Sequence, residues 1–173
     1  MSKKFELTSN FKVFLGRKLF QIRALVSFGD VKEGDLGGYI EKEENLSHDG
    51  NAWVYDNAEV YGNVRVYGNA EVYGNAEVCG NAEVCGDAWV CGNARVCGDA
   101  DYTTVKGFGI EFRTSTFFKC KDGAVRVRCG CFYGDLNEFR EQVKNTRSGK
   151  IAEEYLMIAD LMENTSRRSS YGS

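Results

Sequence analysis

Residues 50–103 read GNAWVY DNAEVY GNVRVY GNAEVY GNAEVC GNAEVC GDAWVC GNARVC GDADYT, a six-residue phrase repeated nine times without a break. In almost every phrase the third and fifth residues are small or branched and apolar, as in Ala70 and Val72. A polar residue or Trp stands between them, and this period of two is typical of a short strand with one buried face. The first two residues, mostly Gly followed by Asn or Asp, accept the backbone angles of a tight corner. Each phrase therefore predicts a short strand followed by a corner.

Six residues cannot bury an apolar face alone, so successive phrases are expected to coil and stack as a solenoid. The phrase V-x-G-[ND]-A-x resembles the hexapeptide repeat of left-handed parallel β-helix proteins, best known from trimeric acyltransferases. The resemblance implies a triangular coil of three phrases per turn, about three to four coils in all, and a homotrimer or a higher multiple. It does not fix the function, because the same coil serves many functions.

Residues one coil apart are expected to lie above one another, at about 4.8 Å. The outward columns are then Trp53, Glu71 and Trp89 on one face, Glu59, Glu77 and Arg95 on the second, and Arg65, Glu83 and Asp101 on the third. The position after each Val gives the columns Tyr55, Tyr73 and Cys91, then Tyr61, Cys79 and Cys97, then Tyr67, Cys85 and Thr103. Asn57, Asn75 and Asn93 align at one corner, where their amides can hydrogen-bond along the stack.

Large exposed aromatic side chains favour interfaces. The candidates for a binding surface or an oligomer interface are therefore Trp53, Trp89, Tyr55, Tyr61, Tyr67, Tyr73, Glu71, Arg65 and Arg95. Two interpretations stay open for these residues, a ligand site and packing between the subunits of a homotrimer.

The open ends of a solenoid expose unpaired backbone and need caps. Alternating apolar and polar residues over 3–26 predict a β-hairpin that caps the N-terminal end. We thus expect an N-terminal β cap over 1–37 and the left-handed β-helix over 38–105.

The C-terminal part predicts a different structure. Asp122-Gly123 is a hairpin turn signal, and Asp135 followed by Glu138 is a capping-box pattern at the start of a helix. A second apolar stripe predicts a helix from about Ile151 to Glu163. The fold class is mainly β, a solenoid with an N-terminal β-hairpin cap, a C-terminal hairpin and two-helix module over 106–164, and a disordered tail over 165–173.

The chain has seven cysteines. Cys79, Cys85, Cys91 and Cys97 fall six residues apart, so consecutive ones sit on different faces and only Cys79 and Cys97 share a column. The C-x2-C pairs typical of zinc sites are absent from the sequence. We expect reduced thiols, with no metal and no cofactor, and a disulfide or metal as the less favoured alternative.

The net charge of −3 is unevenly distributed, since residues 50–101 hold two basic and eight acidic side chains. The acidic charge of this stretch argues against nucleic-acid binding along it. Mimicry of a nucleic acid and binding of a basic partner stay open. No apolar run reaches membrane-spanning length. The start MSKKFELTSN lacks the apolar segment of a secretory signal. A cytoplasmic protein of its host cell, without membrane contact, is expected.

The opening residues, the GDLGGYIE and NLS phrases and the hexads together resemble small hexapeptide-repeat proteins encoded in bacteria, phages and prophages. The likeness covers most of the chain, including VRVRCGCFYGDLNEF. It implies a phage or prophage setting and the cytoplasm of the host cell.

Acyltransferases of the hexapeptide class use a histidine as general base, so the resemblance draws attention to the chain's one histidine, His48. His48 stands where the regular repeats place an inward Val, which favours a structural role over a catalytic one. No extruded loop interrupts the hexads, and a single histidine excludes the three-histidine metal site of γ-class carbonic anhydrases. Arg113, Arg126 and Arg128 are candidates to hold an anion such as a nucleotide phosphate, with solvated strand charges as the alternative.

These observations favour a non-catalytic, phage-encoded binding protein with a counter-defence role, which blocks a host immune protein or sequesters its nucleotide signal. The first alternative is an acyl-CoA-dependent acyltransferase that uses His48. The second is a structural or assembly component of a virion.

Overall fold

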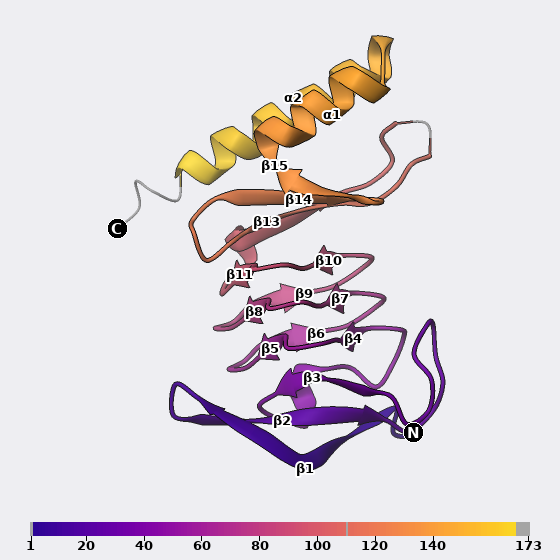
Figure 1. Ribbon diagram of the computed structural model, residues 1–173, viewed down its shortest axis with the longest axis vertical. Coiled ribbons are helices and arrows are strands. Elements are labelled where there is room, and N and C mark those ends of the chain that lie inside the picture. Colours follow the sequence, from indigo (N-terminus) through magenta and orange to yellow (C-terminus); the bar gives the residue numbers. More distant parts are fainter. Residues whose placement is uncertain (1, 110, 169–173) are drawn as a thin grey trace. The chain divides into compact units, whose positions relative to one another are not determined.

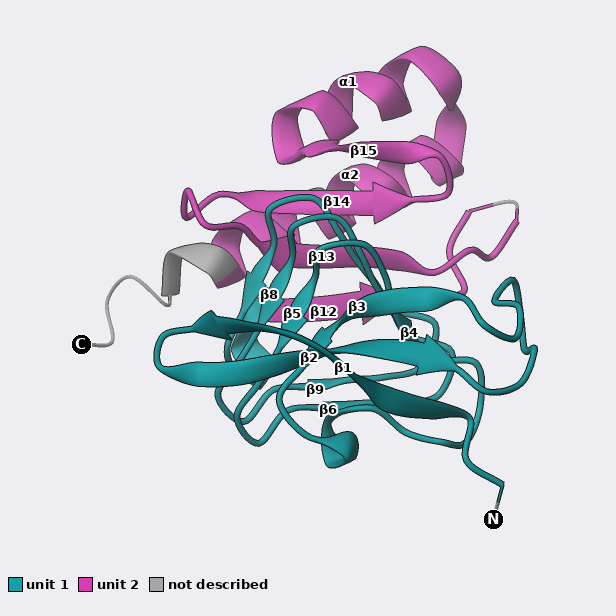
Figure 2. Cartoon of the chain, turned by 60° about the horizontal axis from the view of Figure 1, so that its bottom comes forward, with its two compact units in different colours: residues 1–101 teal, residues 102–173 magenta. Residues whose placement is uncertain are grey.

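The computed structural model describes residues 2–109 and 111–168, with side chains described as far as residue 165. The chain divides into two compact units, residues 1–101 and residues 102–173, which are drawn in different colours in Figure 2. The first unit contains both the N-terminal cap and the solenoid. The C-terminal unit begins at Tyr102, close to the predicted start of the C-terminal module at residue 106.

The N-terminal cap is an antiparallel hairpin of β1 (Phe5–Phe14) and β2 (Arg17–Ala24). A third strand, β3 (Leu36–Ile40), pairs antiparallel with β2. On its other edge β3 pairs parallel with β5 (Glu59–Val60), a strand of the solenoid. The predicted hairpin cap is confirmed, and β3 joins it to the solenoid through a continuous ladder.

Each regular phrase forms a two-residue strand, and Figure 1 shows these strands stacked in coils above the hairpin. The strands are Trp53–Val54 (β4), Glu59–Val60 (β5), Arg65–Val66 (β6), Glu71–Val72 (β7), Glu77–Val78 (β8), Glu83–Val84 (β9), Trp89–Val90 (β10) and Arg95–Val96 (β11). Strands of neighbouring coils pair parallel, in the sheet orders β3-β5-β8-β11, β4-β7-β10 and β6-β9. The chain thus forms a β-solenoid of about three turns, as predicted.

The register of the coils confirms the first two predicted outward columns and the Arg65–Glu83 part of the third, whereas Asp101 lies in a turn (Asp99–Asp101) outside the ladder. Glu71 is the partner of both Trp53 and Trp89, and Glu77 lies between Glu59 and Arg95. The inward Ala and Val residues line the interior with almost no exposed surface, as Val60 and Val72 do at 0 %. Their burial supplies the main driving force for stacking, since apolar area removed from water is the dominant favourable term in folding.

The corners require glycine because the backbones of neighbouring coils approach closely there. Gly50 has φ +70°, and a Cβ there would lie 2.4 Å from the carbonyl oxygen of Gly68 in the next coil. Corner amides also bond along the stack, with Asn51 Nδ2 3.3 Å from Asn69 Oδ1 and Asn63 Nδ2 3.1 Å from Asn81 Oδ1. These ladders run along two of the three corners of the coil.

Short 3₁₀ turns interrupt the first coil at Glu43–Asn45 (η1) and follow the last one at Asp99–Asp101 (η2). Asn45 is fully buried, and its amide nitrogen donates to the carbonyl oxygens of Gly62 and Val64 at 3.1 and 2.9 Å. The irregular first coil is therefore tied to the second coil by a side chain where its phrases depart from the repeat.

The C-terminal unit is an antiparallel sheet with two helices. Its elements are β12 (Tyr102–Val105), β13 (Ser115–Lys119), β14 (Val125–Cys129), β15 (Phe132–Asp135), α1 (Leu136–Thr146) and α2 (Gly149–Arg168). Phe117 and Val127 of the sheet pack with Phe139 of α1 and Ala159 of α2, so both helices cover one face of the sheet. Within the described ranges, no helix is long and apolar enough to cross a lipid bilayer.

Several C-terminal predictions are confirmed and others differ. Gly123, with φ +81°, makes the turn between β13 and β14, and α1 begins with the expected capping box. Strands β12 and β15 were not predicted. Residues 165–168, expected in a disordered tail, continue α2, and residues 169–173 lie outside the described part of the chain.

The capping box of α1 makes a testable contribution to stability. Asp135 Oδ1 accepts from the Glu138 amide, and Glu138 Oε2 accepts from the Asp135 amide, both at 2.8 Å. Asp135→Ala is expected to lower the unfolding free energy of the C-terminal unit by about 1 kcal/mol, measured by urea denaturation. Glu141→Ala, at an exposed position of the same helix, is the control, and an equal loss in both variants would contradict the capping role.

Candidate functional site

The two tryptophans of the first outward column have different surroundings. Trp53 is only 1 % exposed, because the rings of Phe5 and Phe28 lie against it with centroids at 6.3 and 5.4 Å. Trp89, two coils further on, is half-buried. The prediction that Trp53 is an exposed aromatic is wrong, since the N-terminal cap covers that end of the column. Trp89 and the half-buried Glu71 stay candidates for an interface.

The tyrosine columns also divide between buried and accessible residues. Tyr55 and Tyr73 are half-buried, and their rings meet edge to face at 6.4 Å. Burial, with the nearby charge of Glu71, raises the pKa of Tyr55 to about 12. Tyr61 is buried, because Phe14 of the hairpin packs on its ring at 5.8 Å. Tyr61 is therefore not available as the exposed contact that the column pattern predicted.

His48 has defined partners on both ring nitrogens. Its Nδ1 accepts a hydrogen bond from the backbone N–H of Lys4 at 3.1 Å, and its Nε2 lies 2.8 Å from Glu43 Oε1. The ring also stacks on Phe5, with centroids 4.3 Å apart and planes at 19°. The N-terminal strand and the first coil are thus joined through this side chain.

The partners of His48 decide its tautomer. An Nδ1 atom that accepts from an amide carries no proton, so in the neutral ring the proton is on Nε2 and is donated to Glu43. A general base needs a lone pair directed at its substrate. The lone pair of Nδ1 is directed at the Lys4 amide, and the geometry supports the structural role predicted for His48.

A groove opens beside His48 on the β6-β9 face, with a volume of about 680 Å³. It is lined by Glu43, Glu44, Leu46, Ser47, His48, Arg65, Val66 and Tyr67. The Arg65 guanidinium lies 5.6 Å from the centre of the Tyr67 ring, and the Tyr67 hydroxyl donates to Glu83 at 3.1 Å. His48, Arg65 and Tyr67 were separate candidates in the sequence, and the structure brings them to one surface.

Two carboxylates and one arginine line the groove, and the ammonium group of Lys3 pairs with the Glu43 carboxylate at 2.9 Å. Hydrogen bonds from Lys3 and then from His48 hold the pKa of Glu43 below its ordinary value. Glu44 is exposed at the same rim. The sequence analysis did not identify Glu43 and Glu44 as part of a site. The phrase EENLSH departs from the repeat, so the repeat does not predict the directions of its side chains.

The three arginines predicted as an anion site, Arg113, Arg126 and Arg128, do not come together in the C-terminal unit. Arg113 lines a pocket of about 170 Å³ on the helix side of the sheet, where it pairs with Glu111. Arg126 and Arg128 alternate with Val127, whose side chain is in the core under the helices, so they point to the opposite face. Arg126 pairs there with Asp122 at 2.7 Å. Arg113 thus lies on a different face of the sheet from Arg126 and Arg128.

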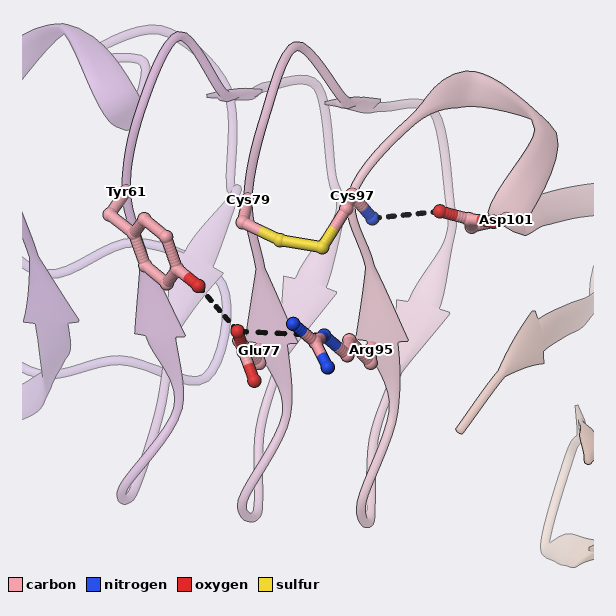
Figure 3. Close-up of a disulfide and its surroundings, with 6 residues drawn as sticks. All are labelled: Tyr61, Glu77, Cys79, Arg95, Cys97 and Asp101. Carbon is pink, nitrogen blue, oxygen red and sulfur yellow. Dashed lines mark hydrogen bonds and ion pairs between the residues drawn. A yellow bond between two sulfur atoms is a disulfide. The ribbon is translucent and has the colours of Figure 1, made fainter. Parts of the chain in front are cut away.

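A second cluster lies on the β5-β8-β11 face, where Cys79 and Cys97 form a disulfide between neighbouring coils (Figure 3). Their Cα atoms are 4.3 Å apart, as the shared column requires. The expectation of reduced thiols is wrong for this pair in the structure. The backbone N–H of Cys97 donates to Asp101 Oδ2 at 3.0 Å and so fixes the end of the last coil.

Glu77 is the buried carboxylate of this cluster, at 4 % exposure. The Tyr61 hydroxyl donates to Glu77, and Arg95 Nε lies 3.7 Å from Glu77 Oε1, as Figure 3 shows. Burial, and then the bond to Glu77, raises the pKa of Tyr61 well above its usual range, so the phenol stays a neutral donor. Sequence analysis placed Glu77 in an outward column and missed its burial, although Tyr61, Cys79 and Cys97 stand in the adjoining column.

Comparison with known proteins relates the coil to other repeats. No family model matches the chain. A stretch of 38 residues is 47 % identical to a protein of Escherichia coli (strain K12) described as "Uncharacterized acetyltransferase YdcK". The coil is a hexapeptide-repeat β-solenoid. Its about three turns and this match fit a left-handed β-helix, as the sequence predicted.

The match has a limited extent. It spans 22 % of this chain and 12 % of the Escherichia coli protein, so the chain covers about an eighth of that protein's length. A likeness confined to one stretch bears on the fold of the repeat, and it carries no information on the activity of the whole protein.

Proposed function

We propose that this chain is a non-catalytic binding protein and that the groove around His48 is its binding surface. The observation that carries the proposal is the engagement of both ring nitrogens of His48, the sequence's one histidine, by Lys4 and Glu43. A histidine in this arrangement positions the N-terminal strand and the groove wall. The groove itself has the size of ligand pockets, which enclose about 300–1,000 Å³.

The charge of the groove favours a basic group on the partner. Glu43 and Glu44 line it together with Arg65, and Tyr67 offers an aromatic face beside them. Complementary charge steers association, so the exposed Glu44 carboxylate at the rim attracts a Lys or Arg side chain. A host protein with an exposed basic segment therefore fits better than a nucleotide signal. The homotrimer and the counter-defence role in a phage setting stay predictions from the resemblance.

Native mass spectrometry of the protein purified from its host cells tests this proposal. We expect extra mass that leaves on denaturation and that corresponds to a protein with a basic segment. The double variant Glu44→Arg, Tyr67→Ala is expected to lose this mass, because it reverses the charge of the exposed rim carboxylate and removes the aromatic face of the groove. Arg95→Glu, on the β5-β8-β11 face, is the matched control and keeps the partner. Capture of the same partner by the groove variant would contradict the proposal.

An acyl-CoA-dependent acyltransferase is the second candidate, favoured by the 47 % identical stretch in a protein described as an acetyltransferase. In that case His48 must release the Lys4 amide in order to accept a proton from the acceptor substrate. Turnover of acetyl-CoA by the purified chain, lost in His48→Gln, would replace the binding proposal with this one. We expect no turnover in either protein.

A further inference from the structure

The Cys79–Cys97 cluster has a geometry that suits a cation. One ligand atom each from Glu77, Cys79 and Cys97 lies within 4.8 Å of the other two. Glu77 and Cys79 are two residues apart on one coil and point to the same side, and Cys97 is stacked on Cys79 from the next coil. The three side chains therefore converge on one point of the β5-β8-β11 face.

We propose that the reduced form of this cluster is a Zn²⁺ site, with the sulfurs of Cys79 and Cys97 and a carboxylate oxygen of Glu77 as ligands. A dithiol reductant supplies the two electrons and two protons that convert the disulfide into two thiols, and becomes a disulfide itself. Zn²⁺ then displaces the two thiol protons and bonds to the thiolates. Water takes the fourth position, as at zinc sites with three protein ligands.

The ligand types select the metal class. Thiolates favour zinc and other thiophilic ions over magnesium or calcium, and carboxylate oxygen is also a common zinc ligand. Bond lengths of about 2.3 Å to sulfur and about 2.0–2.2 Å to oxygen place tetrahedral ligands roughly 3.5–3.8 Å apart. The cluster lies within that reach with movement of side chains alone, because the stacked strands already fix both cysteine backbones.

The surroundings of Glu77 match those of a metal ligand. The Tyr61 hydroxyl donates to its carboxylate, as outer hydrogen-bond donors do to ligating groups. Zn²⁺ with two thiolates and a carboxylate carries one net negative charge, which the Arg95 guanidinium near Glu77 offsets.

The site is separate from the groove around His48, which lies on the β6-β9 face. It links two coils through Cys79 and Cys97, so bound metal would hold the coils together where the disulfide does in the oxidised chain. The two proposals are independent, and failure of one leaves the other in place.

Titration of the full chain tests the zinc site, after reduction by a phosphine reductant and with Co²⁺ and Zn²⁺ as probes. We expect about one Co²⁺ per chain with thiolate-to-cobalt charge-transfer absorption, displaced by Zn²⁺, and a rise of the melting temperature on Zn²⁺ addition. Cys79→Ser is expected to abolish the absorption, and Tyr61→Phe to weaken affinity by about 10–100-fold. Cys85→Ser, at the same position of the phrase on another face, is the matched control and keeps full binding.

Two results would overturn the proposal. The first is the absence of charge-transfer absorption in the reduced wild type, and the second is equal metal binding by wild type and Cys79→Ser. Should Cys79→Ser fail to fold, hydrogen peroxide treatment of the Zn²⁺-loaded wild type decides the matter. Oxidation to the Cys79–Cys97 disulfide must release the metal, and retention of Zn²⁺ in the oxidised chain refutes thiolate ligation.

Discussion

Trp53→Ala is expected to lower the free energy of unfolding of the N-terminal unit by about 3–5 kcal/mol. Trp53 is 1 % exposed and packs against Phe5 of β1 and Phe28 of the loop before β3. Truncation to alanine removes the largest fully buried side chain and leaves a cavity between the cap and the first coil. The loss should appear as a lower urea midpoint in far-UV circular dichroism, at an unchanged or smaller slope.

Trp89→Ala is the matched control for this prediction. Trp89 occupies the same position of the phrase in the same column as Trp53, on the other side of Glu71. Because it is half-buried, its truncation removes less apolar surface from the folded chain, and a loss of about 1 kcal/mol is expected. Equal losses in the two variants would show that the cap does not stabilise the coil through Trp53.

The repeat made the solenoid predictable, because its period fixes both the strands and their alignment. Inward Ala and Val, corner Gly and the 18-residue partnership of Glu59 with Glu77 follow from counting along the sequence. The period does not show which coil the N-terminal hairpin covers. Trp53 and Tyr61 are equivalent in pattern to Trp89 and Tyr67, yet the hairpin buries the first pair through Phe5 and Phe14.

The candidate sites show a similar division. Sequence reasoning placed Cys79 and Cys97 in one column, which is the relation that the disulfide requires, but the neighbouring Glu77 read as an outward surface charge. Its burial depends on Tyr61 in the preceding coil and on the hairpin, and neither contact is local in sequence. The groove around His48 arises in an irregular phrase, where counting gives no position for the side chains.

Lys4 is expected to make the stability of the N-terminal unit rise with pH. The side chain is 4 % exposed, with Nζ donating to the Ala52 carbonyl at 2.8 Å and lying 4.7 Å from the centre of the Phe28 ring. Burial lowers the pKa of Lys4 from 10.5 to about 8, against the opposing charge of Asp49. Between these values the unfolded chain holds the proton and the folded chain does not, so unfolding becomes less favourable as pH rises.

The size of the effect follows from the shift in proton affinity. A shift of one pKa unit corresponds to about 1.4 kcal/mol. The free energy of unfolding is therefore expected to rise by roughly 3 kcal/mol between pH values below 8 and above 10.5. Urea unfolding of wild type and Lys4→Met across this window isolates the lysine, because all other titrating groups are common to both proteins. We expect the free energy of unfolding of the wild type to rise relative to that of Lys4→Met as the pH rises.

Lys18→Met is the control for the pH series, since Lys18 is an exposed lysine of the same N-terminal hairpin. Its stability curve should run parallel to that of the wild type from about pH 7 upward. If the Lys4→Met curve is parallel as well, the ammonium group of Lys4 is not held in a low-dielectric site. The cap would then join the first coil through the packing of Phe5 and Trp53 and the His48 hydrogen bond, without a charge enclosed between them.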